Sequence, residues 1–257
     1  MIPGPLLQVD RLCKSFGGLT AVSDLSFEVG HGQIKAMIGP NGAGKTTILN
    51  LISGVLAPTS GDILLQGRQI TGCGTDGVAG QGVGRTFQIV RLFRELTALE
   101  NVMVGCHPWA RAGLIAAALR FPAARRMESR IAEEAGRWLE YVGLESRAQE
   151  IAGNLPLGDQ RLLELARSLA SRPSLLLLDE PASGLNDAER ERFGSLMDEV
   201  RKQGVTMLLV EHNMDLVMSI SDEIIVVNYG EKLAEGTPAH IRSQQEVIAA
   251  YLGDSRA

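Results

Sequence analysis

Hydrophobic positions in the first half of the chain follow two different spacings. Residues 25–29 alternate apolar and polar side chains, and residues 34–38 are nearly all apolar, so both are predicted strands. In residues 132–144, apolar side chains recur at helical spacing, at Ala135, Trp138, Leu139 and Val142. The pattern therefore predicts a strand-rich N-terminal part followed by a helical segment.

Strands and helices alternate again in the C-terminal third. Apolar runs at residues 175–178, 205–210 and 224–227 are predicted strands, separated by a helix over about residues 187–202 and by a short second helix. Apolar strands separated by helices are typical of a parallel sheet that is covered on both faces. The predicted fold class is therefore α/β, with the helical segment inserted into it or packed on it.

The bulk composition agrees with a globular chain. A length of 257 residues is enough for a large core and a smaller subdomain, and 45% hydrophobic and 21% charged residues are ordinary proportions. The longest uncharged apolar run, residues 112–119, is far below the roughly 18 residues that cross a bilayer. The N-terminus has no basic region followed by an apolar stretch, so neither export nor membrane insertion is predicted.

The net charge and the cysteine content bear on the partners of the chain and on its redox compartment. The formal net charge of −5 gives no general attraction to phosphate backbones, so no nucleic-acid partner is expected. Cys13, Cys73 and Cys106 are odd in number, widely separated and without metal-ligand spacing. Reduced thiols in a cytosolic setting are the favoured interpretation, ahead of disulfides or a zinc site.

A glycine-rich segment between the strand at residues 34–38 and a predicted helix at 48–52 matches the pattern GxxxxGK[ST]. Small residues let backbone N–H groups turn toward phosphates, and the positive end of the helix points at the same anion. Lys45 is predicted to reach the β- and γ-phosphates of ATP, and Thr46 to ligate Mg²⁺. The predicted ATP-binding residues are Gly39, Pro40, Asn41, Gly42, Ala43, Gly44, Lys45, Thr46 and Thr47.

Two carboxylates follow the predicted strand at residues 175–178, at the end where sheets of this type carry their sites. Asp179 is predicted to hold Mg²⁺ through water, and Glu180 to orient and deprotonate an attacking water. The alternative is a helix N-cap region before Pro181, where carboxylates are also favoured. The nearby phosphate loop favours the catalytic interpretation.

With these motifs, Phe16, Gln88 and His212 complete a series that resembles the ATPases of the ABC transporter family over residues 7–253. The resemblance implies that Phe16 stacks on adenine, with an ordinary core phenylalanine as the alternative. It implies that Gln88 touches Mg²⁺ and the water, and that His212 contacts the γ-phosphate. For His212, the alternative is a surface or capping histidine.

The family's signature position falls just before a predicted helix at residues 161–169. In the family, the N-terminus of this helix faces a γ-phosphate that is bound by the opposite subunit, which implies a dimer with shared sites. The matching residues are Leu155, Pro156, Leu157, Gly158, Asp159 and Gln160. Compared with the common LSGGQ pattern, only Leu155 and Gly158 are unchanged, and Asp159 would repel a phosphate unless it turned away as a helix cap.

The resemblance also implies an overall organisation. It predicts a P-loop NTPase core with a parallel sheet, an N-terminal antiparallel β subdomain and an inserted helical subdomain. A single ABC ATPase domain spans 1–257, with 1–88 and 154–257 as the nucleotide-binding core and about 89–153 as the helical subdomain. The loop that crosses the dimer interface in the family matches Ser183, Gly184, Leu185 and Asn186.

Residues 84–88, 99–102, 235–238 and 250–253, with the proline-bearing signature, are similar to the branched-chain amino-acid uptake subfamily. This similarity implies ATP and Mg²⁺ as cofactors and a peripheral place on the cytoplasmic face of the cell membrane. The implied partners are transmembrane permease subunits and a second ATPase subunit, identical or paralogous. A periplasmic or extracellular solute-binding protein would take part indirectly.

Three alternatives stay open at this point. Lipopolysaccharide export would be expected to carry a more usual LSGG signature. An ABC-like ATPase acting on nucleic acid or ribosomes is disfavoured by the single phosphate loop, the acidic balance and the lack of a long heptad segment. A small-molecule kinase would leave Gln88, the signature region and His212 unexplained.

Overall fold

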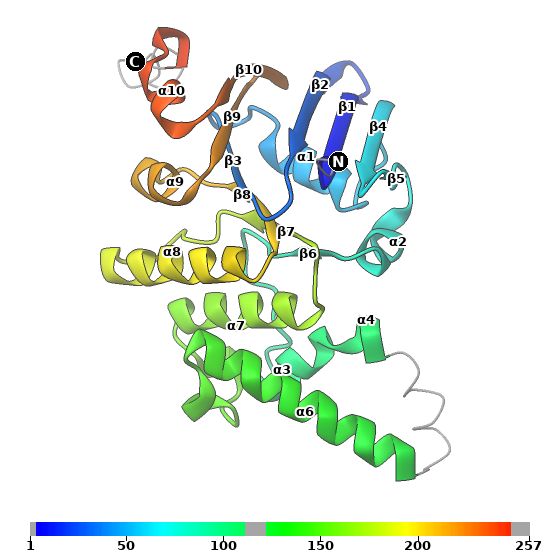
Figure 1. Ribbon diagram of the computed structural model, residues 1–257, viewed down its shortest axis with the longest axis vertical. Coiled ribbons are helices and arrows are strands. Elements are labelled where there is room, and N and C mark those ends of the chain that lie inside the picture. The colour runs from blue at the N-terminus through cyan, green and yellow to red at the C-terminus, as the bar shows by residue number, and fades with distance from the viewer. Residues whose placement is uncertain (1–3, 111–121, 248–257) are drawn as a thin grey trace.

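The computed structural model describes residues 4–110 and 122–247, and it contains two sheets and a layer of helices (Figure 1). The apolar run at 112–119 and the ending at 250–253 lie outside the described residues. None of the described helices is long and apolar enough to span a bilayer.

The first sheet is antiparallel, with strand order β2-β1-β4-β5. Along its central pair, β1 and β4, alternate side chains such as Val9 and Ile63 are buried and lie opposite each other. One face of the sheet is therefore covered while the other meets solvent. Its strands are β1 (Leu7–Phe16), β2 (Leu19–Val29), β4 (Ser60–Leu65) and β5 (Arg68–Gln69).

The second sheet forms the centre of the molecule, with strand order β10-β9-β3-β8-β7-β6. All its neighbouring strands pair in parallel except the edge strand β10, which is antiparallel to β9. Every residue of β3, β7 and β8 is buried, which explains their continuous apolar runs. The strands are β3 (Ile34–Ile38), β6 (Val83–Arg85), β7 (Leu175–Asp179), β8 (Thr206–Val210), β9 (Glu223–Asn228) and β10 (Glu231–Gly236).

Helices cover both faces of the central sheet. One core cluster joins α1 to the antiparallel sheet and to one face of the central sheet. Side chains of α8 and α9 take part in the clusters on the other face, with α9 to the left of the strands and α8 below them in Figure 1. The helices around the sheet are α1 (Lys45–Ile52), α2 (Gly74–Gly80), α8 (Asp187–Lys202), α9 (Met214–Ile220) and α10 (Pro238–Ser243).

A separate layer of helices packs under α8 (Figure 1). Here α7 contacts both α3 and α6. Its members are α3 (Ala98–Gly105), α4 (His107–Ala110), α6 (Pro122–Val142) and α7 (Leu157–Ala170). The division at residue 153/154 stays a prediction, since α7 lies beyond it and yet packs with this layer.

Candidate functional site

The phosphate loop connects the end of β3 to the start of α1, as its sequence pattern predicts. Gly44 caps α1 with a left-handed φ of 101°, and an added Cβ would lie 2.5 Å from the backbone oxygen of Ala21. Glycine is therefore required there by both conformation and space. Thr46 is exposed on the first turn of α1, within reach of a bound ion or nucleotide.

Lys45 is buried against its own loop. Its Nζ donates to the backbone oxygens of Gly39 at 2.6 Å and Pro40 at 2.9 Å. Burial lowers the pKa of Lys45, while the charges of Glu180 and Asp179 raise it. The lysine charge is thus held between the loop and the two acidic residues, where a phosphate would also be attracted.

The acidic pair lies at the carboxyl end of β7. Asp179 is 2% exposed, and its Oδ2 accepts a hydrogen bond from Arg85 at 3.2 Å. Burial raises the pKa of Asp179, and the adjacent Arg85 lowers it. Its other oxygen, Oδ1, is buried and has no hydrogen-bond partner among the described residues, which is a suitable arrangement for a cation or its bound water.

The helix-cap alternative for this pair is wrong. The following helix, α8, begins at Asp187, and its cap is Asn186, whose side chain accepts from the N–H of Glu189. Glu180 instead has a left-handed φ of 48°, which is uncommon for a residue with a side chain. Its backbone N–H donates to the oxygen of Val210 at the end of β8, so two neighbouring strands fix this position.

Glu180 joins the two other predicted catalytic residues. Its Oε2 accepts from Nε2 of Gln88 at 2.9 Å, and its Oε1 is 2.5 Å from Nε2 of His212. These three residues come from the ends of different strands, after β6, β7 and β8. The His212 ring contacts the carboxylate, and the cap of the next helix is Asn213, so the capping alternative for His212 is wrong. The side chain is 41% exposed, in agreement with the surface alternative.

Phe16 lies at the end of β1 and is 46% exposed, so the core alternative for this residue is also wrong. The Nζ of Lys14 lies 5.0 Å from its ring centroid. An exposed aromatic ring beside a cation leaves area that a planar base can cover. Adenine stacking stays a prediction.

The signature segment differs from the expectation for Asp159. This residue lies in the first turn of α7 but makes no capping hydrogen bond, and its carboxylate is 3.3 Å from Nε of Arg147. Gln160 folds back onto the backbone oxygen of Leu155 at 2.7 Å. The cap at Pro156 has no side-chain hydrogen bond, so the first N–H groups of α7 are not capped by a side chain.

Residues 183–186 follow the acidic pair and lead into α8. Gly184 has a φ of 81°, and Leu185 is buried. Asn186 caps α8 in a reciprocal capping box with Glu189, a role that explains an amide at this position. The dimer-crossing role of the loop is not tested by these contacts and stays a prediction.

Sequence reasoning missed two buried charged residues that support the site. Glu211 is 3% exposed, and its carboxylate accepts from the backbone N–H of Ala182 at 2.8 Å and of His212 at 2.9 Å. Arg85 donates to Oγ of Ser53 at 2.7 Å besides its contact with Asp179. The sequence did offer one signal for Glu211, because this charged residue directly follows the apolar run 205–210, at the end of a predicted strand.

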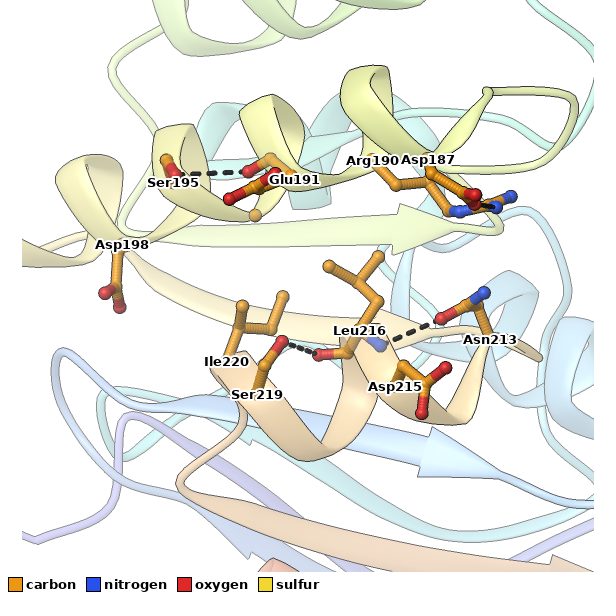
Figure 2. A pocket seen from close by; sticks show the side chains of 11 residues that line it. Asp187, Arg190, Glu191, Ser195, Asp198, Asn213, Asp215, Leu216, Ser219 and Ile220 are labelled. Carbon is orange, nitrogen blue, oxygen red and sulfur yellow. Dashed lines mark hydrogen bonds and ion pairs between the residues drawn. The ribbon is translucent and has the colours of Figure 1, made fainter.

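A groove between α8 and α9 lies outside this cluster (Figure 2). Its volume is about 590 Å³, and it contains none of the predicted site residues. Figure 2 shows acidic and polar side chains along both helices, with Leu216 and Ile220 between them. The phosphate loop and the cluster around Glu180 therefore form the candidate functional site.

Comparisons with known proteins identify the family of the chain. A family model described as ABC transporter matches residues 22–183. A second model, described as branched-chain amino acid ATP-binding cassette transporter, matches residues 231–257. The chain is 48% identical to the high-affinity branched-chain amino acid transport ATP-binding protein LivG of Salmonella typhimurium and to the corresponding protein BraF of Pseudomonas aeruginosa. Each match covers 98% of this chain and 99% of the relative.

Solved structures show the same fold. A nucleotide-free ATP-binding cassette from an ABC transporter superimposes with a TM-score of 0.83 at 27% identity, covering 96% of this chain and 99% of the other. The ADP conformation of an ATP-binding cassette also gives a TM-score of 0.83 at 27% identity, covering 97% of this chain and 99% of the other.

Proposed function

The chain belongs to the ABC transporter family as an ATPase that couples ATP hydrolysis to transport, and from this premise we propose that it powers high-affinity uptake of branched-chain amino acids. The substrate class rests on the 48% identity to LivG and BraF and on the second family model. The hydrogen bonds that join Gln88, Glu180 and His212 support the hydrolytic role of the site. The lipopolysaccharide alternative is not favoured by these relatives.

We propose that residues 39–47 bind the phosphates of ATP. The N–H groups at the start of α1 and the buried charge of Lys45 both favour an anion there. Phe16 offers an exposed ring for the adenine. Thr46, Asp179 through water, and Gln88 would hold Mg²⁺, whose charge would offset the charge that develops on the phosphates.

Glu180 is proposed as the general base. Its carboxylate already has two partners, so its direction is restricted before water arrives. It would accept the proton of the attacking water while Gln88 orients that water, and His212 would contact the γ-phosphate. The carboxylate oxygen Oδ1 of Asp179, with no hydrogen-bond partner among the described residues, supports the metal assignment.

Assembly is proposed on the same basis. Residues 155–160 would face ATP held by a second ATPase subunit, identical or paralogous, with residues 183–186 crossing between the two. Transmembrane permease subunits would bind the helical layer, and a periplasmic or extracellular solute-binding protein would deliver the amino acid to them. This arrangement would place the chain on the cytoplasmic face of the cell membrane.

The test is Glu180→Gln, assayed for ATP binding and hydrolysis. The amide keeps the shape of the side chain and removes the base, so kcat should fall about 100-fold or more while ATP affinity is kept. The matched control is Glu140→Gln, which changes an exposed glutamate of α6 and should retain turnover. Unchanged turnover in Glu180→Gln would contradict the role of the base.

The same variant tests assembly and substrate. Light scattering with and without MgATP, alone and mixed with any paralogous ATPase encoded beside it, should detect an ATP-dependent dimer. In vesicles that contain the whole transporter, the wild-type chain should drive leucine, isoleucine or valine uptake and Glu180→Gln should not. ATP turnover without uptake of these amino acids would leave the ATPase assignment intact and contradict the substrate.

A further inference from the structure

One face of α7 contacts a loop that is distant in sequence. Arg161, Glu164 and Ser168 are spaced by three and four residues, so they lie on the same side of the helix. All three are buried, with exposed fractions of 7%, 1% and 8%. Each makes a hydrogen bond to the backbone of residues 85–91, the segment that carries Gln88.

Arg161 makes the central contacts. Its Nη1 donates to the backbone oxygen of Phe87 at 3.0 Å, and its Nη2 donates to that of Gln88 at 2.7 Å. The same Nη2 lies 3.5 Å from the backbone oxygen of Ser183, in the proposed dimer-crossing loop. One planar guanidinium therefore contacts two loops, a geometry that its fixed fork of donors suits.

The two flanking residues hold the ends of the same segment. Glu164 accepts from the backbone N–H of Arg91 at 3.0 Å, and Ser168 donates to the backbone oxygen of Arg85 at 3.2 Å. Burial raises the pKa of Glu164, although the hydrogen bonds and nearby arginines lower it. Burying two charged side chains is costly unless they are well paired, so their position here indicates a specific role in holding the loop.

The segment needs such support because it has no regular structure of its own. The strand β6 ends at Arg85, and the next helix, α3, begins at Ala98. Buried backbone groups in an irregular segment must find partners outside it. The Phe87 and Gln88 oxygens find theirs on α7, and the side chain of Gln88 then reaches Glu180.

We propose that Arg161 is a positioning residue for ATP hydrolysis, which makes the placement of Gln88 beside Glu180 depend on the position of α7. The inference rests on the proposed function. Because α7 begins at the proposed signature segment, contact with a second subunit's ATP would be transmitted along one rigid helix to Gln88 and Ser183 of the same chain. The ATP site on one subunit would thereby set the hydrolytic competence of the other.

The test compares Arg161→Met and Arg161→Lys in the assembled transporter. Methionine keeps an unbranched side chain but removes the hydrogen bonds to Phe87, Gln88 and Ser183. We therefore expect kcat to fall about tenfold or more while KM for ATP changes less than about threefold. Lysine retains one charged donor and should recover part of the loss. The matched control is Arg192→Met, which removes an arginine hydrogen bond to the backbone oxygen of Val142 and should keep kcat.

A second arm tests whether Arg161 acts through Gln88. Combined with Gln88→Ala, Arg161→Met should lower kcat little beyond Gln88→Ala alone, because the side chain being positioned is already gone. The proposal would be overturned if the double variant lost kcat by the product of the two single-variant reductions. It would also be overturned if Arg161→Met raised KM for ATP by the same factor by which it lowered kcat. Thermal unfolding is measured for every variant, and if Arg161→Met is unfolded, the cycle is run with Arg161→Lys.

The outcome separates this inference from the proposed function. Wild-type ATP turnover that is lost in Glu180→Gln but retained in folded Arg161→Met and Arg161→Lys would overturn only the role of Arg161. Absence of ATP turnover in the wild-type transporter would instead contradict the proposed function itself.

Discussion

The phosphate loop and the loop around Gln88 meet at one site but are held in different ways. The phosphate loop joins β3 to α1, whose buried residues share a core cluster with Ala43 of the loop, and its shape is set by glycine conformation and by backbone contacts. The segment at 85–91 leaves the sheet after β6 and is held by side chains of α7. Nucleotide binding is thus built into the core, whereas the placement of Gln88 depends on the helical layer.

This difference separates binding from turnover. Changes in the phosphate loop should reduce ATP affinity directly, because the groups that would contact phosphate are altered. Changes in the contacts between the two layers should leave those groups in place and reduce turnover instead. A variant of the contacts between α7 and residues 85–91 that weakens ATP binding more than turnover would contradict this difference between the two loops.

The largest effect is expected for Lys45→Ala. It removes the buried charge beside the phosphate loop, so ATP affinity should fall about 100-fold or more. A fluorescent ATP analogue in an equilibrium titration measures this change. Lys202→Ala, at the end of α8, removes a lysine far along the chain from the loop and should bind normally. Unchanged affinity in Lys45→Ala would contradict the assignment of the loop.

A smaller effect is expected for Glu211→Gln, which alters a contact between two catalytic loops. The amide nitrogen would face a backbone N–H of Ala182 or His212 in place of an accepting oxygen. Unfolding free energy should fall by about 1–3 kcal/mol, as measured by urea denaturation. Turnover should fall with it, because one of the two loop peptides, at Ala182 or at His212, loses its accepting oxygen, while ATP affinity stays near that of the wild type.

Glu191→Gln is the control for this variant, since Glu191 is exposed on α8. Equal unfolding midpoints for Glu211→Gln and the control would mean that the contacts of Glu211 with the backbone N–H groups of Ala182, His212 and Asn213 contribute little. If Glu211→Gln lost ATP affinity by a larger factor than turnover, the proposed separation between residues for ATP binding and residues for turnover would be contradicted.

The sequence predicted those elements whose signals are local. Residues 34–38 are β3, and residues 187–202 are α8, whose capping residues lie next to the helix they cap. The predicted helix at 132–144 is confirmed as part of α6, although that helix starts at Pro122 and ends at Val142. Apolar periodicity identifies a helix by its buried face, so it does not locate a charged first half.

Long-range contacts left no comparable signal. The strands β1 and β4 pair with each other although β2, β3 and α1 lie between them in the sequence. The contact of Arg161 with Phe87 and Gln88 joins two segments that are far apart in sequence and meet only because α7 packs beside β6 and the loop. Arginine in a helix ordinarily indicates a solvated face, and its burial was visible only in three dimensions.

The same limit applied to Asp159. Sequence reasoning offered phosphate repulsion or a helix cap, because both depend on the residue's position in its own helix. The structure supplies a third solution, since Arg147, at the end of the 3-10 helix Glu145–Arg147, pairs with the carboxylate. The charge of Asp159 is thereby partly offset by Arg147, which also pairs with Glu150 and is not part of the signature pattern.

The smallest effect is therefore expected for Arg147→Gln. Both partners are partly exposed, so the pair itself contributes little stability, about 0–1 kcal/mol. Without Arg147, however, the charge of Asp159 stays unpaired near the N-terminus of α7. If that end faces a phosphate of the second subunit, ATP-dependent association should weaken about two- to fivefold, and more at low salt than at high salt.

Light scattering across a range of ATP concentrations measures this association, in the Glu180→Gln background so that ATP persists. The matched control is Arg137→Gln, which removes an exposed arginine of α6 that pairs with Glu134. Adding Asp159→Asn to Arg147→Gln should restore association, because the unpaired charge is then removed. If Arg147→Gln associates as the control does, Asp159 does not approach a phosphate in the dimer, and the N-terminus of α7 would have to contact the second subunit in another way.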